Sequence, residues 1–231
     1  AVEMFATIAS SVVCATPSAQ SFTLPPAALA SGNTLTAMLA QPDTGDIALV
    51  YSAPSASPDS GDWLALRISA FASRSVSSAC PSSTGFTTAS DPIAGAQAHL
   101  VSTTTVLPLP LRAGAPVHFV RRGRYSLYRS SDSKWYLGYR RCSAWGPSAC
   151  GSIQPVSGPY DPYSSDRSKS GLVFRYFDES GLEVVSGASS TVARVEISMR
   201  GAASSSGLTG DLGESYRDSA VISVSPRNRA R

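Results

Sequence analysis

The stretch Gly171–Val185, GLVFRYFDESGLEVV, decides the fold class of this 231-residue chain. It opens with apolar side chains at every second position and then reaches the turn sequence DESG. Two later stretches, Val192–Arg200 (VARVEISMR) and Ser219–Asn228 (SAVISVSPRN), alternate in the same way. Because successive side chains of a strand point to opposite faces, the three stretches predict an antiparallel sheet with one apolar face.

The apolar face of this predicted sheet lacks a partner within the chain. It would carry Leu172, Phe174 and Tyr176 from the first strand and Val195, Ile197 and Met199 from the second. One-sided sheets pack such a face on a helix or on a second sheet, but no stretch shows helical periodicity over an adequate length. We therefore expect the covering element to be missing, and the chain to be the trimmed soluble part of a longer protein.

The rest of the chain also favours β structure. The run Asp46–Ser52 (DIALVYS) predicts a central strand, and Trp63–Ser73 (WLALRISAFAS) predicts another. Val117–Arg129 and Lys134–Cys142 predict a hairpin, because both arms are rich in aromatic and β-branched residues. The sequence thus predicts a mainly β, antiparallel fold in a single domain of residues 1–231, with residues 171–231 as its C-terminal three-strand unit.

Three segments give weaker patterns. We expect two short strands near the N-terminus around a turn at Thr16–Ser18. Residues 76–105 are rich in Ser, Thr and Gly and predict a long surface loop with a strand or two. Residues 151–170, which contain several Pro and Gly, predict a further loop.

The composition excludes some classes of function. Only 15% of the residues are charged and the net charge is +3, which gives no argument for nucleic-acid binding. No stretch reaches the ~18 apolar residues that a membrane span needs. A surface built from Ser and Thr is common among exported proteins, and we expect an exported protein.

The cysteines are Cys14, Cys80, Cys142 and Cys150, without a CxxC pair. This spacing does not indicate a metal site, and no metal ligands are assigned. An even number of cysteines in a Ser-rich chain favours disulfides formed in an oxidising compartment. Of the three connectivities we favour Cys14–Cys80 with Cys142–Cys150, the second of which would close the short loop CSAWGPSAC.

The order of the C-terminal strands resembles the end of type IV minor pilins and type II secretion pseudopilins, especially the PilW-like group. The matching residues are Gly171, Phe174, Tyr176, Asp178 and Gly181 in the first element, Val192, Val195, Ile197 and Met199 in the second, and Arg227 with Asn228 in the third. The middle hairpin, RRGRYSLYRSSDSKWYLGYRRC, is also similar to pilin-like proteins. The front end departs from the family, because Glu3 does not match the Glu of the long apolar helix with which such proteins begin.

The resemblance implies a pilin-like head domain, α+β when its N-terminal helix is present. It implies a non-enzymatic assembly subunit whose partners are other pilin or pseudopilin subunits of a type IV pilus-like or type II secretion fibre. Such a subunit would be periplasmic or extracellular, anchored in the inner membrane before fibre assembly, with membrane contact only through the missing helix. A secreted β-sandwich that binds a glycan or surface ligand through Trp63, Trp135, Trp145 and Tyr side chains is the alternative.

The sequence assigns no catalytic residue. A Gly-x-Ser-x-Gly nucleophile elbow is absent. His99 and His118 could each serve a catalytic triad, but we interpret them as structural. Asp178 and Glu179 lie in the predicted turn DESG, where Asp is a common turn residue, so they are not interpreted as paired catalytic carboxylates.

Two other kinds of ligand site remain as alternatives. Asp161–Asp166 (DPYSSD) and Asp59–Asp62 (DSGD) could offer oxygen ligands to Ca²⁺, although neither resembles an EF-hand loop and no cofactor is expected. A basic and aromatic patch could hold a phosphate backbone. Its members are Arg121, Arg122, Arg124, Tyr125 and Tyr128. We favour an ordinary solvated strand face for this patch, and nucleic acid as a partner is not expected.

Overall fold

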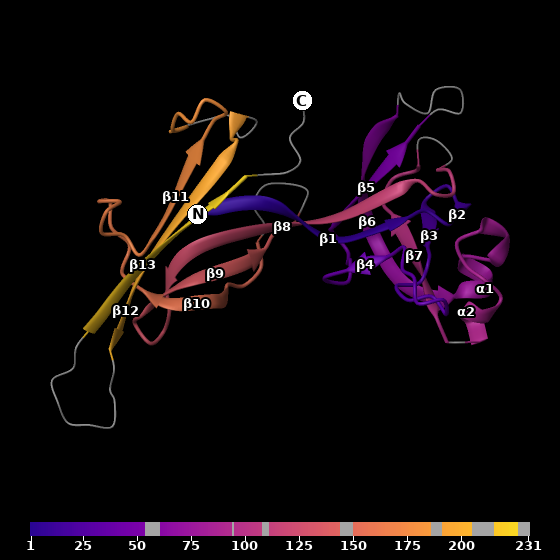
Figure 1. Cartoon of the computed structure of the whole chain (residues 1–231), viewed down its shortest axis with the longest axis horizontal. Helices are drawn as coiled ribbons and strands as arrows, with labels where there is room; N and C mark the ends of the chain where they lie inside the picture. The colour runs from indigo at the N-terminus through magenta and orange to yellow at the C-terminus, as the bar shows by residue number, and fades with distance from the viewer. Residues whose placement is uncertain are drawn as a thin grey trace. The chain divides into compact units, whose positions relative to one another are not determined.

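The computed structural model describes residues 1–53, 61–93, 95–107, 111–143, 150–185, 191–204 and 215–225. Its elements are mainly strands, paired antiparallel, so the predicted fold class is confirmed (Figure 1). Where the sequence was interpreted as one domain, the chain divides into two compact units. The larger unit contains residues 4–123 and 141–150, and the smaller unit contains residues 1–3, 124–140 and 151–231.

In the larger unit, neighbouring strands follow the order β8, β5, β6, β7, β3, β2. Their bounds are β8 (Pro116–Arg129), β5 (Ile47–Ser52), β6 (Asp62–Ser75), β7 (Gln97–Thr103), β3 (Ser21–Leu24) and β2 (Ala15–Ser18). Another strand, β1 (Val2–Val12), pairs with β8 and with the short β4 (Ala37–Met38). Because β5 pairs with both β6 and β8, the central strand predicted at Asp46–Ser52 is confirmed.

The core of the larger unit forms from the inward positions of these strands. Phe22 of β3 and Phe119 of β8 are fully buried, as is Val50 of β5. The burial alternates in part of each strand, at residues 48–51 of β5 and at residues 117–119 of β8. Burial of each large apolar side chain contributes about 1.5–3 kcal/mol.

The turn expected at Thr16–Ser18 is wrong, because those residues belong to β2. The chain turns at Ala19 and Gln20 instead. Ser18 pairs with Ser21 across this two-residue turn, and the Ser18 hydroxyl accepts a 3.2 Å hydrogen bond from the Gln20 N–H. Pro17 fits within β2 because that strand ends the order of neighbouring strands.

The region expected to be a long loop holds short elements and one strand. They are α1 (Val76–Ala79), a 3₁₀ turn η2 (Ser82–Thr84), α2 (Ser90–Ile93) and β7. The carboxylate of Asp91 accepts 2.6 Å bonds from the backbone N–H groups of Ala30 and Thr88. These two loop N–H groups have no strand or helix partner in these bonds, and the buried Asp91 carboxylate satisfies them instead.

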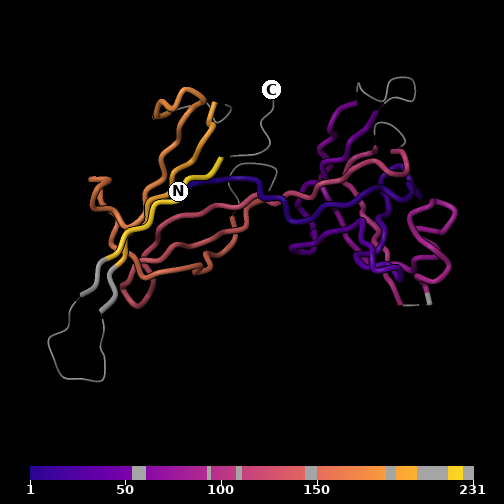
Figure 2. The backbone as a smooth tube through the Cα atoms, viewed as in Figure 1, coloured from indigo at the N-terminus to yellow at the C-terminus, as the bar shows by residue number. Residues whose placement is uncertain are grey.

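In the smaller unit, the end of β8 is followed by β9 (Trp135–Arg141) and β10 (Gln154–Tyr160). The tube in Figure 2 shows β8 and β9 side by side, as the predicted hairpin requires. The loop expected at residues 151–170 is wrong in part, because β10 pairs with β9. Pro155 and Pro159 obscure this strand in the sequence, and its edge position and register shifts accommodate them.

A separate three-stranded antiparallel sheet holds β11 (Leu172–Phe177), β12 (Arg194–Ser204) and β13 (Ser215–Val224), with β12 in the middle (Figure 1). It lies where the alternating pattern predicted three strands. Phe174 pairs with Ile197, which pairs with Ile222, and the register continues without a shift. The turn after β11 places Gly181 at φ +79°, as DESG predicted.

Candidate functional site

The strand register collects apolar side chains on one side of the three-stranded sheet, here called the apolar face. Its members are Leu172, Phe174, Tyr176, Val195, Ile197, Met199, Ala220, Ile222 and Val224. Exposure rises across the sheet, from Leu172 at 7% to Ile222 at 47% and Val224 at 49%. The Met199 end lies against β10, where the Tyr160 hydroxyl is 3.6 Å from the Met199 sulfur. The apolar face is therefore covered at one end and open at the other.

The opposite face of the same sheet carries polar pairs, together with Val221, which is 63% exposed. The Arg175 guanidinium donates to Glu183 at 3.0 Å and to Glu196 at 3.2 Å. These bonds, with one from Arg167, lower the pKa of Glu183. The Arg194 guanidinium stacks 4.1 Å from the centre of the Phe177 ring. Arg175 thus has hydrogen-bonding partners on this opposite face, whereas the side chains of the apolar face are stabilised only by packing on another element.

A groove of about 520 Å³ adjoins the apolar face within the smaller unit. It is lined by Leu172, Phe174 and Tyr176 of β11 and by Arg124 and Leu127 of β8. Burial raises the pKa of the Tyr176 phenol, so this side chain stays neutral at ordinary pH. The groove thus combines an apolar wall with two guanidinium groups, those of Arg124 and Arg167.

Gly171 fixes the loop beside this groove to the sheet. A Cβ at this position would collide with the carbonyl oxygen of Asp161. The Gly171 N–H donates to the Pro162 carbonyl at 3.2 Å, and its carbonyl accepts from the Arg200 N–H at 2.9 Å. The glycine matched in the sequence pattern is therefore required for close approach of two backbone segments.

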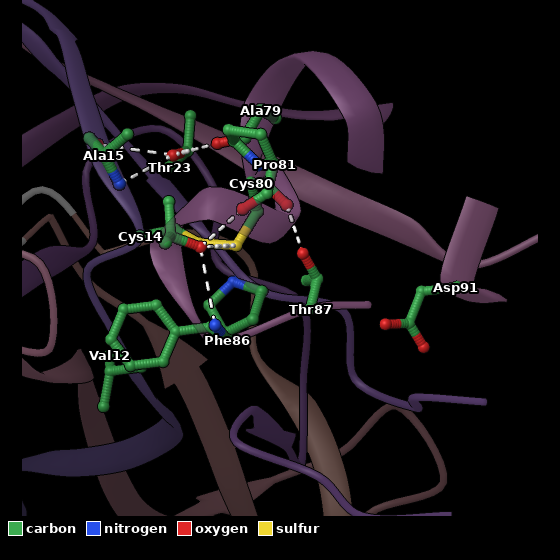
Figure 3. Close-up of a disulfide and its surroundings, with 12 residues drawn as sticks. Val12, Cys14, Ala15, Thr23, Ala79, Cys80, Pro81, Phe86, Thr87 and Asp91 are labelled. Atoms are coloured by element: carbon green, nitrogen blue, oxygen red, sulfur yellow. Dashed lines mark hydrogen bonds between the residues drawn. A yellow bond between two sulfur atoms is a disulfide. The ribbon is translucent and has the colours of Figure 1, made fainter. Parts of the chain in front are cut away.

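The favoured disulfide pairing is present. Cys14 bonds to Cys80 and Cys142 bonds to Cys150, with Cα atoms 5.5 Å and 3.9 Å apart. Cys14 and Cys80 are buried, and the Thr87 hydroxyl donates to the Cys80 carbonyl at 2.6 Å (Figure 3). Two disulfides indicate a protein that matures in an oxidising compartment, outside the cytoplasm.

The basic and aromatic patch divides between the two units. Arg121 donates to Asp46 at 2.7 Å, and Arg122 donates to the Ser143 carbonyl at 3.2 Å, both within the larger unit. In the smaller unit, Arg124 lies 3.7 Å from Glu3. The tyrosines of the patch, Tyr125 and Tyr128, contact Tyr139 and Tyr136, with ring centres 5.1 Å and 6.2 Å apart. The patch residues are thus engaged with the protein itself.

Asp46 is an interacting residue that the sequence analysis missed. Its carboxylate is 2% exposed and also accepts a 3.2 Å bond from Arg141. Asp46 directly precedes β5, and the two arginines come from β8 and β9. Sequence periodicity carries no signal for such a pair, because the partners are 75 positions or more apart.

The two segments considered as Ca²⁺ sites, Asp161–Asp166 and Asp59–Asp62, would need clustered metal ligands. Across the described ranges, His, Cys, Asp and Glu side chains form no group of three or more that could hold a metal ion. In the DPYSSD segment, Asp161 donates its N–H to the Arg200 carbonyl, and Asp166 accepts from Ser168 at 2.7 Å. Asp59 lies outside the described residues, as do Trp145, Arg227 and Asn228.

The two histidines have aromatic neighbours. His99 of β7 stacks on Phe71 at 5.0 Å, and burial lowers its pKa. His118 of β8 lies 5.2 Å from the ring of Trp63, which also contacts Tyr51 at 5.6 Å. Trp63 is 48% exposed. Tyr51, Trp63 and His118 come from three adjacent strands and form a surface cluster, here called the aromatic cluster.

No protein-family model, no curated protein and no solved structure matches the chain. No helix among the described residues is long and apolar enough to cross a membrane. A functional proposal therefore rests on the geometry above and on the sequence resemblance.

Proposed function

We propose that the chain is a non-enzymatic assembly subunit, the head of a minor pilin or pseudopilin in a type IV pilus-like or type II secretion fibre. The observation that carries this proposal is the apolar face, open at Ile222 and Val224. An apolar sheet face is stabilised by packing on another element. In this proposal that element is an apolar helix or a neighbouring subunit of the fibre.

Further support comes from the order of elements. The three strands occur at the residues that resemble the PilW-like pattern, and Gly171 and Gly181 have the backbone roles described above. Two disulfides suit a subunit that is exported and exposed on a fibre. The disulfides would then contribute stability, and the apolar face would contribute binding.

The test joins the chain to a standard pilin helix in a bacterium that lacks its own minor pilin of this type. The chain should be recovered in sheared fibres and should cross-link to other minor pilins. Val224→Lys adds a charge to the open end of the apolar face and should reduce that recovery. Ser223→Lys adds the same charge on the opposite face and should not.

Two outcomes would reject this function. The chain could be absent from fibres while folded and exported, or the purified chain could hydrolyse esters or glycosides. Equal loss of recovery in Val224→Lys and Ser223→Lys would mean that the apolar face is not the surface through which the chain enters the fibre.

The aromatic cluster favours a second candidate, a secreted module that binds a glycan or surface ligand. Trp63 presents about half of its surface, and its ring contacts the rings of Tyr51 and His118. Flat aromatic surfaces with limited side-chain freedom make efficient contact platforms. A glycan array tests this candidate, with Trp63→Ala expected to abolish any signal. The matched control, Tyr163→Ala, removes a more exposed aromatic side chain of the smaller unit and should retain the signal.

A further inference from the structure

Strand β13 forms one edge of the three-stranded sheet. Its pairing with β12 runs from Val195–Val224 to Ser204–Ser215 without a register shift. Within the described residues, β12 is its only neighbour in the sheet. A regular strand of this length with one side unpaired can add another strand by main-chain hydrogen bonds.

The backbone groups on the outer side of β13 can be assigned from Arg200. The N–H of Arg200 donates to Gly171 and its carbonyl accepts from the Asp161 N–H, both at 2.9 Å, so both groups point away from β13. Arg200 pairs with Ser219, and hydrogen-bonded and non-hydrogen-bonded pairs alternate in an antiparallel ladder. The N–H and C=O groups of Ser219, Val221 and Ser223 therefore face outward. The Ser219 N–H donates to the Asp218 carboxylate at 2.7 Å, so the pairing proposed below depends mainly on Val221 and Ser223.

The outer edge of β13 lacks the features that usually protect edges. Residues 219–224, SAVISV, contain no proline and no charged residue, and no bulge interrupts their register. Val221 is 63% exposed on one face, and Ile222 is 47% exposed on the other. Natural sheets usually cover such an edge or break it with charge, proline or a bulge.

We propose that β13 pairs antiparallel with β13 of a second copy of this chain, about a two-fold axis at Val221. Val221 then meets Val221 of the other copy in a hydrogen-bonded pair. Ser219 of one copy lies opposite Ser223 of the other, and Ala220 lies opposite Ile222. The two-fold axis repeats each of these pairs on the other side of Val221. Such an isologous contact closes after two copies.

The side-chain chemistry of the strand favours a second copy as its partner. Residues 219–224 carry no charge, so the self-pairing brings no like charges together. Asp218 falls opposite Val224 and away from its own mate. Ser219 opposite Ser223 permits cross-strand hydroxyl contacts, and Ala220 opposite Ile222 joins the two apolar faces into one. This contact requires only β13 and is independent of the fibre function.

Sedimentation equilibrium of the whole chain tests the dimer. Val221→Pro removes an outward N–H without removing a bond to β12, because proline is tolerated at such edge positions. It should raise the dimer dissociation constant at least about tenfold. Val221→Thr keeps the N–H and the branched shape and should sediment like the parent chain. A monomeric parent chain, or a Val221→Pro chain that dimerises equally well, overturns the proposal.

Cysteine cross-linking tests the register independently, and it still decides if Val221→Pro fails to fold. Hydrogen-bonded pairs place Cα atoms about 5.5 Å apart, within the range that a disulfide spans. Val221→Cys should form an intermolecular disulfide on oxidation, and Ser219→Cys alone should not. The double variant Ser219→Cys with Ser223→Cys should cross-link through the unlike pair. Equal cross-linking of Val221→Cys and Ser219→Cys overturns the proposed register.

Discussion

Asp46 and Arg121 form an ion pair in which the carboxylate is 2% exposed and the closest nitrogen and oxygen atoms are 2.7 Å apart. Arg121 also donates to the Gln41 carbonyl at 3.0 Å, and the Asp43 N–H donates to Asp46 at 2.9 Å. The pair therefore links β8 to the segment that leads into β5.

Removing one partner of this pair should be costly. Arg121→Met leaves a buried carboxylate without its main partner and should lower the free energy of unfolding by about 3 kcal/mol. Arg124→Met, which removes the exposed pair with Glu3, should cost less than about 1 kcal/mol. Urea unfolding of both variants measures the difference. Equal losses would mean that burial does not determine the strength of the Asp46 pair.

Substitution of Gly171 should disturb the loop beside the groove. Gly171→Ala places a Cβ against the Asp161 carbonyl and should destabilise the protein by about 1–3 kcal/mol. Gly181→Asn should be nearly neutral, because asparagine tolerates positive φ and nothing lies within 4 Å of an added Cβ. Thermal unfolding compares the two variants. A neutral Gly171→Ala would contradict the close approach.

The two disulfides should differ in their contribution to stability. In the chain-entropy model, the Cys14–Cys80 bond, with a sequence separation of 66, is worth about 4 kcal/mol. The Cys142–Cys150 bond, with a separation of 8, is worth about 2.5 kcal/mol. Paired Cys→Ala variants should therefore lose stability in that order in urea unfolding. Alkylation of all four cysteines without prior reduction would contradict both bonds.

Asp91 should make stability depend on acid pH. Its pKa lies below the usual value because the backbone N–H of Thr88, then that of Ala30, donates to the carboxylate. A carboxyl with a lower pKa in the folded state adds stability above its unfolded pKa of about 3.9 and loses it as the pH falls through the folded value. Asp91→Asn should be less stable at neutral pH, and its stability should change less below about pH 4. Parallel pH curves for the variant and the parent chain would show that Asp91 does not contribute.

Local alternation was sufficient to predict the strands that bury one face. It located the three strands β11, β12 and β13, because apolar residues recur there with the period of a strand. A nearly continuous apolar run indicated β5, and aromatic and β-branched residues indicated the β8–β9 hairpin. It failed for β10, whose Pro155 and Pro159 are typical of loops but are tolerated in an irregular edge strand. It also misplaced the first turn, which lies between the paired residues Ser18 and Ser21.

Side-chain contacts between distant residues were harder to predict from the sequence than the strands were. The disulfide pairing was one of three alternatives, and loop size and turn residues favoured the correct one. The Asp46–Arg121 pair and the aromatic cluster were missed, because strand order rather than sequence spacing brings their members together. The apolar face was predictable because each of its strands carries the pattern on its own.

The division into two units has a consequence for dissecting the protein. The backbone passes from one unit to the other at residues 3–4, 123–124, 140–141 and 150–151. Neither unit is therefore a continuous stretch of sequence, and a single cut in one connection leaves the others intact. Terminal truncation would remove part of a unit rather than release a whole one. Producing the smaller unit alone would need a redesigned chain in which residue 3 is joined to residue 124 and residue 140 is joined to residue 151.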